Sequence, residues 1–303
     1  MKNPICMIVV TFNRKDLLLR NIVAARLQSV PVDILIFDNH SMDGTFEYLC
    51  EKEVLPAENI TYHYAESNCG GAGGFSEGLK IAYEMGYSFF WLMDDDGYCY
   101  NENTLSNLLD RKPDDTDAFI MNSTVICSDE KELTFGFPEI ETYEKLVFAS
   151  ENGVFKGYIN PFNGTLISKG CIDKIGFPIG EFFLYGDEHE YMLRALKNGI
   201  KVETVIDSLY YHPVNRPIEY KKVGRYLVPV KSEPVWKSFC DARNSIYISK
   251  RYESKKMLLI RAYCLVMAAV IKPEKKLRYL HYSLLGINDG LKGNLSRKPM
   301  FDK

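Results

Sequence analysis

The first 121 residues alternate short apolar runs with stretches whose apolar residues recur at helical spacing. The apolar runs predict five strands, at residues 5–12, 33–38, 61–66, 88–93 and 117–121. The stretches between them predict helices at residues 14–28, 44–52, 74–86 and 102–111. Strand–helix alternation of this kind predicts an α/β fold, with a mostly parallel, Rossmann-like sheet joined by right-handed crossovers.

The pattern changes after residue 121. Residues 122–160 are rich in charges and aromatic side chains and are predicted to be irregular and to include a loop or flap over the sheet edge. Further strands are expected at 160–168 and 201–211, with a helix between them that stops at Asn198 and Gly199. Residues 214–233 are predicted to be mobile, and helical spacing then continues to about residue 291 in three segments. We therefore expect a nucleotide-binding domain at 1–232 and a helical, basic region at 233–303.

Composition places the chain among globular proteins. With 303 residues, 46% of them hydrophobic, it can bury a full core. Its eight cysteines form no Cys-x-x-Cys pair, which argues against a zinc site or a disulfide framework and fits a cytoplasmic location. The N-terminus predicts a buried strand rather than a signal peptide, and no window of 18 uncharged apolar residues could span a bilayer.

Charge is distributed unevenly. Residues 250–303 contain 13 Lys and Arg against 4 Asp and Glu, whereas the whole chain carries a net charge of −3. The main domain is therefore acidic, and nucleic acid is not an expected partner.

The triplet Asp94-Asp95-Asp96 ends the apolar run at residues 88–93. Neighbouring carboxylates raise one another's pKa unless a cation neutralises them. Mg²⁺ or Mn²⁺ carrying a substrate phosphate suits such oxygen ligands. The alternative is a solvated acidic turn, but ligands of open α/β sheets bind at the carboxyl ends of strands.

Four further motifs could carry chemistry, and each has a structural alternative. Residues Thr11 to Arg14 open a helix and could bind an anion or be an ordinary helix cap. Asp38 could accept hydrogen bonds from a ribose or base, or belong to a turn. Residues 68–75, Asn-Cys-Gly-Gly-Ala-Gly-Gly-Phe, could approach a ligand closely or form a flexible turn before a helix. Asp187 and Glu188 begin a helix, where one could act as a general base or simply cap it.

The order of these motifs is more specific than any one of them. Together with Asn163-Gly-Thr165 and His212, it resembles the inverting family 2 glycosyltransferases of the GT-A fold over about residues 4–213. The glycine-rich element and the triple Asp are most similar to bacterial galactofuranosyltransferases, with the rhamnosyltransferases next.

The resemblance implies roles residue by residue. Asp96 and His212 would bind the metal, Mn²⁺ or Mg²⁺, while Asp94 and Asp95 would face the nucleotide. Glu188 would be the catalytic base and Asp187 the acidic residue before it, although Asp-Glu replaces the commoner order and leaves the choice between them open. The remaining expected nucleotide contacts are Thr11, Phe12, Asn13, Arg14, Asp38, Asn68, Gly70 and Gly71.

The implied function is metal-dependent, inverting transfer of a sugar, with galactofuranose favoured, from a nucleoside-diphosphate donor such as UDP-galactofuranose. The acceptor would be a hydroxyl of a growing polysaccharide or of a lipid-linked molecule. Transfer from dTDP-rhamnose, a non-catalytic sugar-nucleotide-binding subunit and a sugar nucleotidyltransferase are the alternatives; the last would need a basic, glycine-rich loop after the first strand.

The basic tail has two interpretations. Its apolar residues at 257–271 could pack on the catalytic domain or on a second subunit of a homo-oligomer. They could instead attach the protein peripherally to the inner face of the plasma membrane, with the flanking cations on the anionic lipid surface.

Overall fold

The structure is a computed structural model that describes residues 3–214, 219–230 and 233–299. The chain forms two compact units. The first contains residues 1–69, 74–178 and 191–214, and the second contains 70–73, 179–190 and 215–303. These units group residues that pack together and do not show which parts of the chain fold independently. The predicted domain boundary between residues 232 and 233 therefore stays a prediction.

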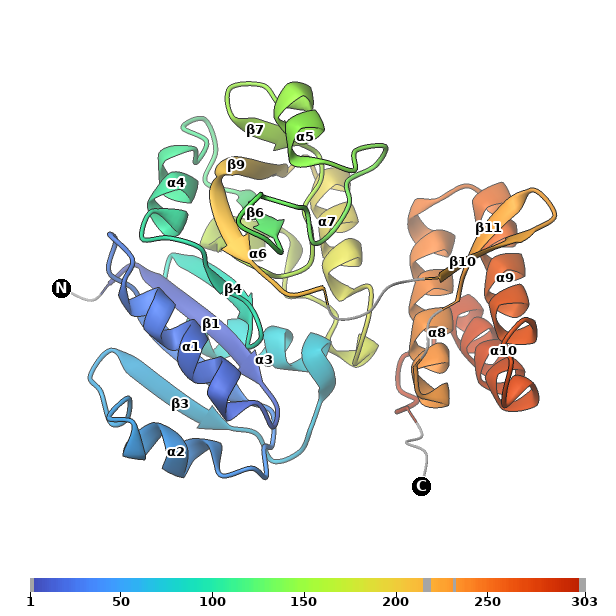
Figure 1. The fold of residues 1–303 in the computed structure, drawn as a ribbon, viewed down its shortest axis with the longest axis horizontal. Coiled ribbons are helices and arrows are strands. Elements are labelled where there is room, and N and C mark those ends of the chain that lie inside the picture. The colour runs from blue at the N-terminus through green and yellow to red at the C-terminus, as the bar shows by residue number, and fades with distance from the viewer. Residues whose placement is uncertain (1–2, 215–218, 231–232, 300–303) are drawn as a thin grey trace. The chain divides into compact units, whose positions relative to one another are not determined.

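The first unit is built on a mixed sheet with the strand order β3-β2-β1-β4-β8-β6-β9-β5, and β7 pairs with β9 beside this path (Figure 1). Its first four strands are all parallel, as the sequence predicts. Their bounds are β1 Ile5–Thr11, β2 Asp33–Asp38, β3 Ile60–Tyr64 and β4 Phe89–Asp94. Their carboxyl ends therefore meet at one edge, where the predicted site residues follow each strand.

The other half of the sheet mixes directions. β8 runs antiparallel to both of its neighbours, β4 and β6, whereas β6 and β9 are parallel. β5 and β7 are both antiparallel to β9. The bounds are β5 Tyr98–Cys99, β6 Phe119–Ile126, β7 Val154–Lys156, β8 Thr165–Ser168 and β9 Lys201–Tyr211.

Alternate residues of β1 enter two separate hydrophobic clusters, because successive strand side chains point to opposite faces. Met7 and Val9 pack with residues of α1, whereas Ile8 and Val10 pack with residues of α3. The sheet is thus covered on both faces, which is usual where strands are parallel and nearly all their residues are apolar. The helices of this part of the chain are α1 Lys15–Arg26, α2 Thr45–Glu51, α3 Gly70–Glu84, α4 Thr104–Asp110, α6 Lys169–Ile175 and α7 Asp187–Lys197.

Three segments differ in secondary structure from the prediction. The helix expected at 74–86 begins at Gly70, so the glycines of the motif lie in the first turns of α3. Residues 122–160 are more regular than predicted, since β6 extends to Ile126 and the segment also contains β7 and a helix, α5 Tyr143–Ala149. In the segment 214–233, predicted to be mobile, the described residues form a hairpin of β10 Glu219–Val223 and β11 Tyr226–Val230; 215–218, 231 and 232 lie outside the described residues.

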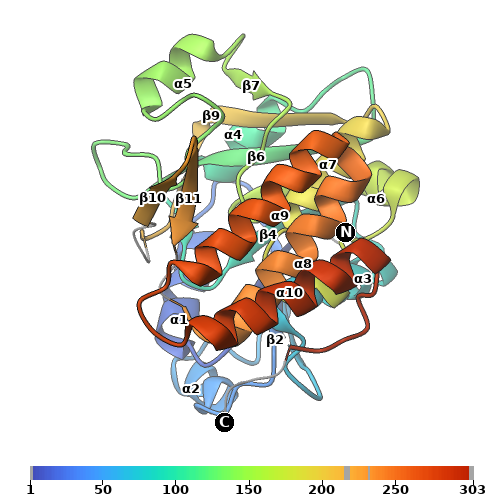
Figure 2. The same ribbon diagram turned by 90° about the vertical axis from the view of Figure 1, so that its right-hand side faces the viewer.

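Three helices dominate the second unit, as predicted: α8 Val235–Tyr252, α9 Lys255–Val270 and α10 Lys276–Lys292 (Figure 2). A short 3-10 turn, η1 Gly180–Phe182, precedes α7. α8 and α10 meet at backbone distance, because a Cβ at Gly286 or Gly290 would lie 2.5 Å from the carbonyl oxygen of Phe239 or Arg243. Among the described residues, no helix is both long and apolar enough to cross a membrane.

Candidate active site

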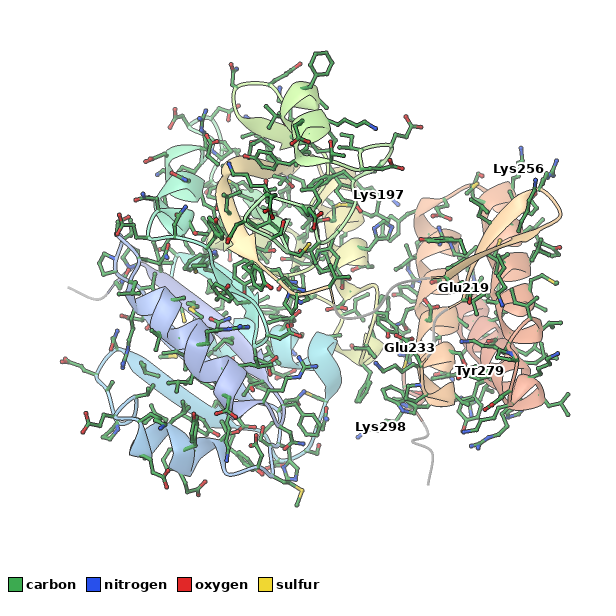
Figure 3. The ribbon with its side chains drawn as sticks, viewed as in Figure 1. Lys197, Glu219, Glu233, Lys256, Tyr279 and Lys298 are labelled. Atoms are coloured by element: carbon green, nitrogen blue, oxygen red, sulfur yellow. The ribbon has the colours of Figure 1, made fainter. Side chains whose placement is uncertain are left out.

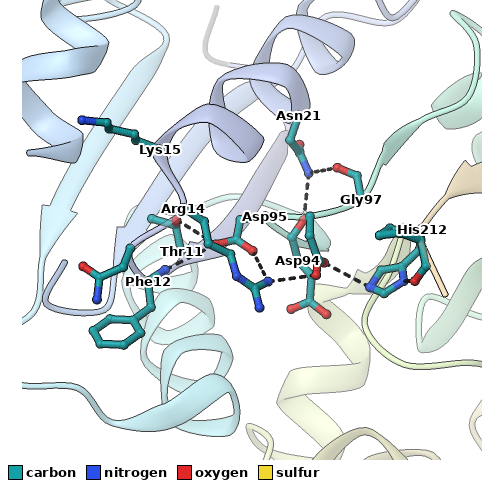
Figure 4. Close-up of polar contacts among 12 residues, drawn as sticks. Thr11, Phe12, Arg14, Lys15, Asn21, Asp94, Asp95, Gly97 and His212 are labelled. Carbon is teal, nitrogen blue, oxygen red and sulfur yellow. Dashed lines mark hydrogen bonds and ion pairs between the residues drawn. The ribbon is translucent and has the colours of Figure 1, made fainter. Parts of the chain in front are cut away.

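The turn after β4 carries the acidic triplet, and a buried asparagine from α1 holds it. The Asn21 side-chain amide donates to the carbonyl oxygens of Asp94 and Gly97, each at 2.8 Å (Figure 4). The Tyr210 hydroxyl, from β9, also donates to the Asp94 carbonyl oxygen at 3.3 Å. Asn21 is completely buried, so the turn depends on a polar residue placed inside the apolar face of a helix.

Asp94, Asp96 and His212 form the cluster best suited to a metal. One ligand atom from each lies within 4.8 Å of the others, and the His212 Nε2 lies 3.1 Å from an Asp96 oxygen. Two carboxylates and an imidazole are a donor set that suits Mn²⁺ and also accepts Mg²⁺. Asp96 and His212 thus lie together as expected, and Asp94 joins them, a grouping that we had not predicted.

The electrostatics of His212 follow from this arrangement. Burial acts to lower its pKa, but the hydrogen bond and charge of Asp96, together with the charge of Asp94, outweigh burial and raise the pKa. The other ring nitrogen, Nδ1, lies 2.8 Å from the Pro213 carbonyl oxygen, which orients the imidazole. The carboxylates therefore already attract a positive charge to this position.

Asp95 points to a different set of partners. Its carboxylate accepts hydrogen bonds from the Thr11 hydroxyl at 2.9 Å and the Phe12 N–H at 3.3 Å. Nη1 of Arg14 bridges it to Asp96, at 3.0 Å and 2.8 Å respectively. Burial raises the pKa of Asp95, and the Arg14 charge opposes that rise. Asp95 thus ties the turn after β4 to the loop after β1, while its contact with a nucleotide stays a prediction.

Asp38 and Asn13 are also engaged within the protein. Asp38 is completely buried; it accepts from the Tyr62 hydroxyl and, at 2.7 Å, from the Ser41 N–H. Asn13 has a positive φ of 55°, and its side-chain oxygen accepts from the Met42 N–H at 2.7 Å. These bonds fix the loops after β1 and β2, where Thr11 to Arg14 and Asp38 stay predicted nucleotide contacts.

Packing explains two of the four glycines in the glycine-rich motif. Gly70 has a positive φ of 75°, and a Cβ there would lie 2.0 Å from the Phe183 carbonyl oxygen. A Cβ at Gly74 would lie 2.5 Å from a methyl group of Val10. Gly71 alone of these three meets nothing within 4 Å. Packing therefore requires glycine at positions 70 and 74. Nucleotide binding by Asn68, Gly70 and Gly71 stays a prediction.

Asp187 and Glu188 begin α7 within the second unit. Asp187 is 5% exposed, whereas Glu188 is partly buried and lines a cavity of about 240 Å³. The cavity is also lined by Tyr185, Gly186, His189, Asp241, Ser245, Ile248 and Arg261. Glu188 thus reaches a space that a small polar molecule could enter.

A mixed α/β sheet with a metal-competent Asp94–Asp96–His212 cluster at the carboxyl end of its fourth strand is the arrangement of a GT-A glycosyltransferase. Residues 6–185 match the family model described as "Glycosyl transferase family 2". This match covers more than half of the protein, and the chain therefore belongs to glycosyl transferase family 2 and is a glycosyltransferase.

Relatives agree with this assignment. The chain is 28% identical over 265 residues to the galactofuranosyltransferase GlfT1 of Mycolicibacterium smegmatis, covering 84% of this chain and 85% of that protein. It is 22% identical over 301 residues to the dTDP-rhamnosyl transferase RfbF of Shigella flexneri, covering 97% of each. Among solved structures, the mannosyltransferase PcManGT from Pyrobaculum calidifontis in complex with GDP-Man and Mn²⁺ is similar in fold, with a TM-score of 0.57 and 14% identity over 98% of this chain and 88% of that one.

Proposed function

We propose that this glycosyltransferase transfers galactofuranose, with inversion, from UDP-galactofuranose to a hydroxyl of a polysaccharide or lipid-linked acceptor. The observation that carries the proposal is the Asp94–Asp96–His212 cluster in a chain whose similarity to a named galactofuranosyltransferase extends over 265 residues. The similarity to a dTDP-rhamnosyl transferase makes rhamnose transfer the second candidate.

Asp94, Asp96 and His212 would hold Mn²⁺ or Mg²⁺ on the donor side of the reaction. A bound divalent cation would neutralise the charge that develops on the departing diphosphate. The chain's own contribution is to keep the ligands in place: Asn21 fixes the turn, and the Pro213 carbonyl orients the His212 ring. The mannosyltransferase of similar fold is described in complex with Mn²⁺, which supports this assignment.

Glu188 would be the general base. In an inverting displacement the acceptor oxygen bonds to the anomeric carbon, the bond from that carbon to the diphosphate oxygen breaks, and one base takes the hydroxyl proton. The exposure of Glu188 to the cavity, against the burial of Asp187, supports Glu188 for this role. A second catalytic carboxylate of the kind that glycoside hydrolases need is not required.

A donor panel tests the proposal. The full chain is incubated with Mn²⁺ and UDP-galactofuranose, dTDP-rhamnose, UDP-glucose or UDP-galactose, and released nucleoside diphosphate and pyrophosphate are measured separately. We expect nucleoside diphosphate release that is fastest with UDP-galactofuranose and lost in EDTA. Faster release from dTDP-rhamnose would identify rhamnose, rather than galactofuranose, as the transferred sugar. Full turnover in EDTA would show that the reaction needs no divalent metal.

We also propose that α9 attaches the protein to an anionic membrane surface. One face of α9 packs against α8 and α10 through Leu258, Ala262, Leu265 and Val266. Its other side is exposed: Leu259 is 71% exposed, Met257 43% and Tyr263 42%. Lysines flank the helix at both ends, with Lys256 extending outward from its first turn (Figure 3). Each basic residue near an anionic leaflet contributes about 1 kcal/mol of binding. Exposed apolar and cationic side chains on one helix fit the surface of such a leaflet.

Flotation with phosphatidylglycerol liposomes tests this attachment. We expect binding that weakens at high salt, that is absent with phosphatidylcholine, and that falls when Lys255 and Lys256 become Glu or when Leu259→Ser is made. Leu27→Ser is the matched control, because Leu27 is 69% exposed on the first unit. Binding that ignores salt, or that Leu27→Ser reduces equally, would reject attachment through α9.

A further inference from the structure

Helix α8 contains two polar residues that are almost completely hidden from solvent. Arg243 is 0% exposed and Asn244 is 1% exposed. Burying a guanidinium group is costly unless every N–H finds an acceptor. The partners of these two residues therefore indicate what the burial achieves.

All three guanidinium nitrogens of Arg243 donate hydrogen bonds to oxygen atoms of the protein. Nη2 donates to the carbonyls of Glu181 and Phe182, each at 2.9 Å. Nη1 donates to those of Arg297 at 2.9 Å and Leu295 at 3.3 Å, in the segment after α10. Its Nε donates to the side-chain oxygen of Asn244 at 2.9 Å. The guanidinium thus joins α8 to two segments that are distant in sequence.

Asn244 completes the contact with one of these segments. Its Nδ2 lies 3.0 Å from the Phe182 carbonyl oxygen, 2.9 Å from that of Leu184 and 2.8 Å from that of Tyr185. Together the two side chains hold the backbone at four of the five positions from 181 to 185. This segment leads directly into Asp187 and Glu188.

The held segment has an unfavourable backbone conformation. Phe183 and Tyr185 have φ values of 64° and 70°, in the left-handed region that non-glycine residues rarely adopt, and Gly186 follows at 85°. Such conformations persist only where the surroundings impose them. The carbonyl oxygens that Arg243 and Asn244 bind belong to this same stretch, so these donors can supply the restraint.

We propose that Arg243 and Asn244 are positioning residues that fix residues 181–186 and thereby set the direction of the Glu188 carboxylate. The proposal deepens the proposed function, on which it rests where it concerns the reaction. Neither residue lines the cavity that Glu188 faces, so both act through the loop. The requirement at position 244 is for N–H donors rather than for volume, because Nδ2 makes the three loop contacts.

The test uses the full chain and variants that separate donors from packing. Asn244→Asp keeps the size and the acceptor for Arg243 but removes the donors, and Arg243→Lys keeps the charge but not the fork. Asn288→Ala is the matched control, because Asn288 is exposed on α10 in the same unit. Hydrogen–deuterium exchange at residues 179–190 and nucleotide release from UDP-galactofuranose are both measured.

In Asn244→Asp we expect the rate of hydrogen–deuterium exchange at residues 179–190 to rise by about tenfold, because the loop loses the stabilisation of at least one hydrogen bond. We expect kcat to fall by roughly 10²-fold, the cost of a misplaced catalytic group, with little change in KM for the donor. Arg243→Lys should show both effects to a smaller extent, and Asn288→Ala neither.

Unchanged exchange at 179–190 in Asn244→Asp would overturn the proposal, as would a rise in donor KM with normal kcat. Absence of nucleotide release from any donor in the unsubstituted protein would reject the proposed function instead. The exchange measurement would then still decide whether these residues fix the loop.

Discussion

Replacing Asn21 by Leu tests whether one buried amide holds the metal-binding turn. Leu keeps the branched shape of Asn, with methyl groups in place of the amide oxygen and nitrogen, but removes the donors that reach the Asp94 and Gly97 carbonyls at 2.8 Å. The Asp94 oxygen retains the Tyr210 hydroxyl at 3.3 Å, whereas the Gly97 oxygen loses the amide. The Asp94 oxygen thus loses one of two donors, and the buried Gly97 oxygen loses the donor that Asn21 supplies. Together these losses should lower the free energy of unfolding by about 2–4 kcal/mol.

Urea denaturation measures this cost. With a slope of about 2 kcal/mol per molar urea, the middle of the usual range, the midpoint should fall by roughly 1–2 M. Asn107→Leu is the control, because Asn107 also donates to a carbonyl oxygen, that of Asp207 at 2.7 Å, but this hydrogen bond is exposed to solvent. Its effect should stay within about 0.5 kcal/mol.

The turn carries two of the three proposed metal ligands, so Asn21→Leu should also weaken Mn²⁺ binding measured by calorimetry. A variant as stable as Asn107→Leu, with normal Mn²⁺ affinity, would refute the reasoning. Loss of stability with normal affinity would limit Asn21 to a structural role.

Three other predictions follow from the site. Glu188→Gln should lower turnover by about 10²–10⁴-fold while keeping donor affinity by calorimetry; if Asp187→Asn is the damaging change instead, the two roles are reversed. Mn²⁺ at about 100 times its Kd should stabilise the protein by about 2.7 kcal/mol in thermal unfolding, and equal stabilisation of Asp96→Asn and His212→Ala would place the ion elsewhere. Gly70→Ala should lower the unfolding temperature because its Cβ would lie 2.0 Å from the Phe183 carbonyl oxygen, whereas Gly71→Ala, with nothing within 4 Å, should not; equal effects of the two would contradict the packing argument.

The sequence predicts the first half of the sheet well because each element there has its own periodicity. Leu18 and Ile22 mark the buried face of α1, and β2 begins and ends at the residues predicted for it. The antiparallel insertion of β8 between β4 and β6 depends on pairing between distant segments. Local periodicity carries no information about such pairing. The hairpin at 219–230 escaped prediction because charged residues obscure its alternation.

The site was predictable in composition but not in detail. The sequence places three carboxylates at one strand end, but the turn decides that Asp94 and Asp96 face His212 while Asp95 faces Thr11. Asn21 was detectable in principle, since a polar residue at helical spacing with Leu18 and Ala25 must find a buried partner. Arg243 gives a comparable signal, because it lies at helical spacing with Phe239 and Tyr247. Its partners could not be predicted, because they include backbone carbonyls more than 50 residues away.

The bonds from Arg243 to the carbonyl oxygens of Leu295 and Arg297 give the segment after α10 an influence on residues 181–186. A truncation or proteolytic cut before residue 295 would leave one arm of a buried guanidinium without acceptors, and the other arm holds residues 181 and 182. Trimming the C-terminus would therefore disturb a loop more than 100 positions upstream. An affinity tag is accordingly better placed at the N-terminus than beside this segment.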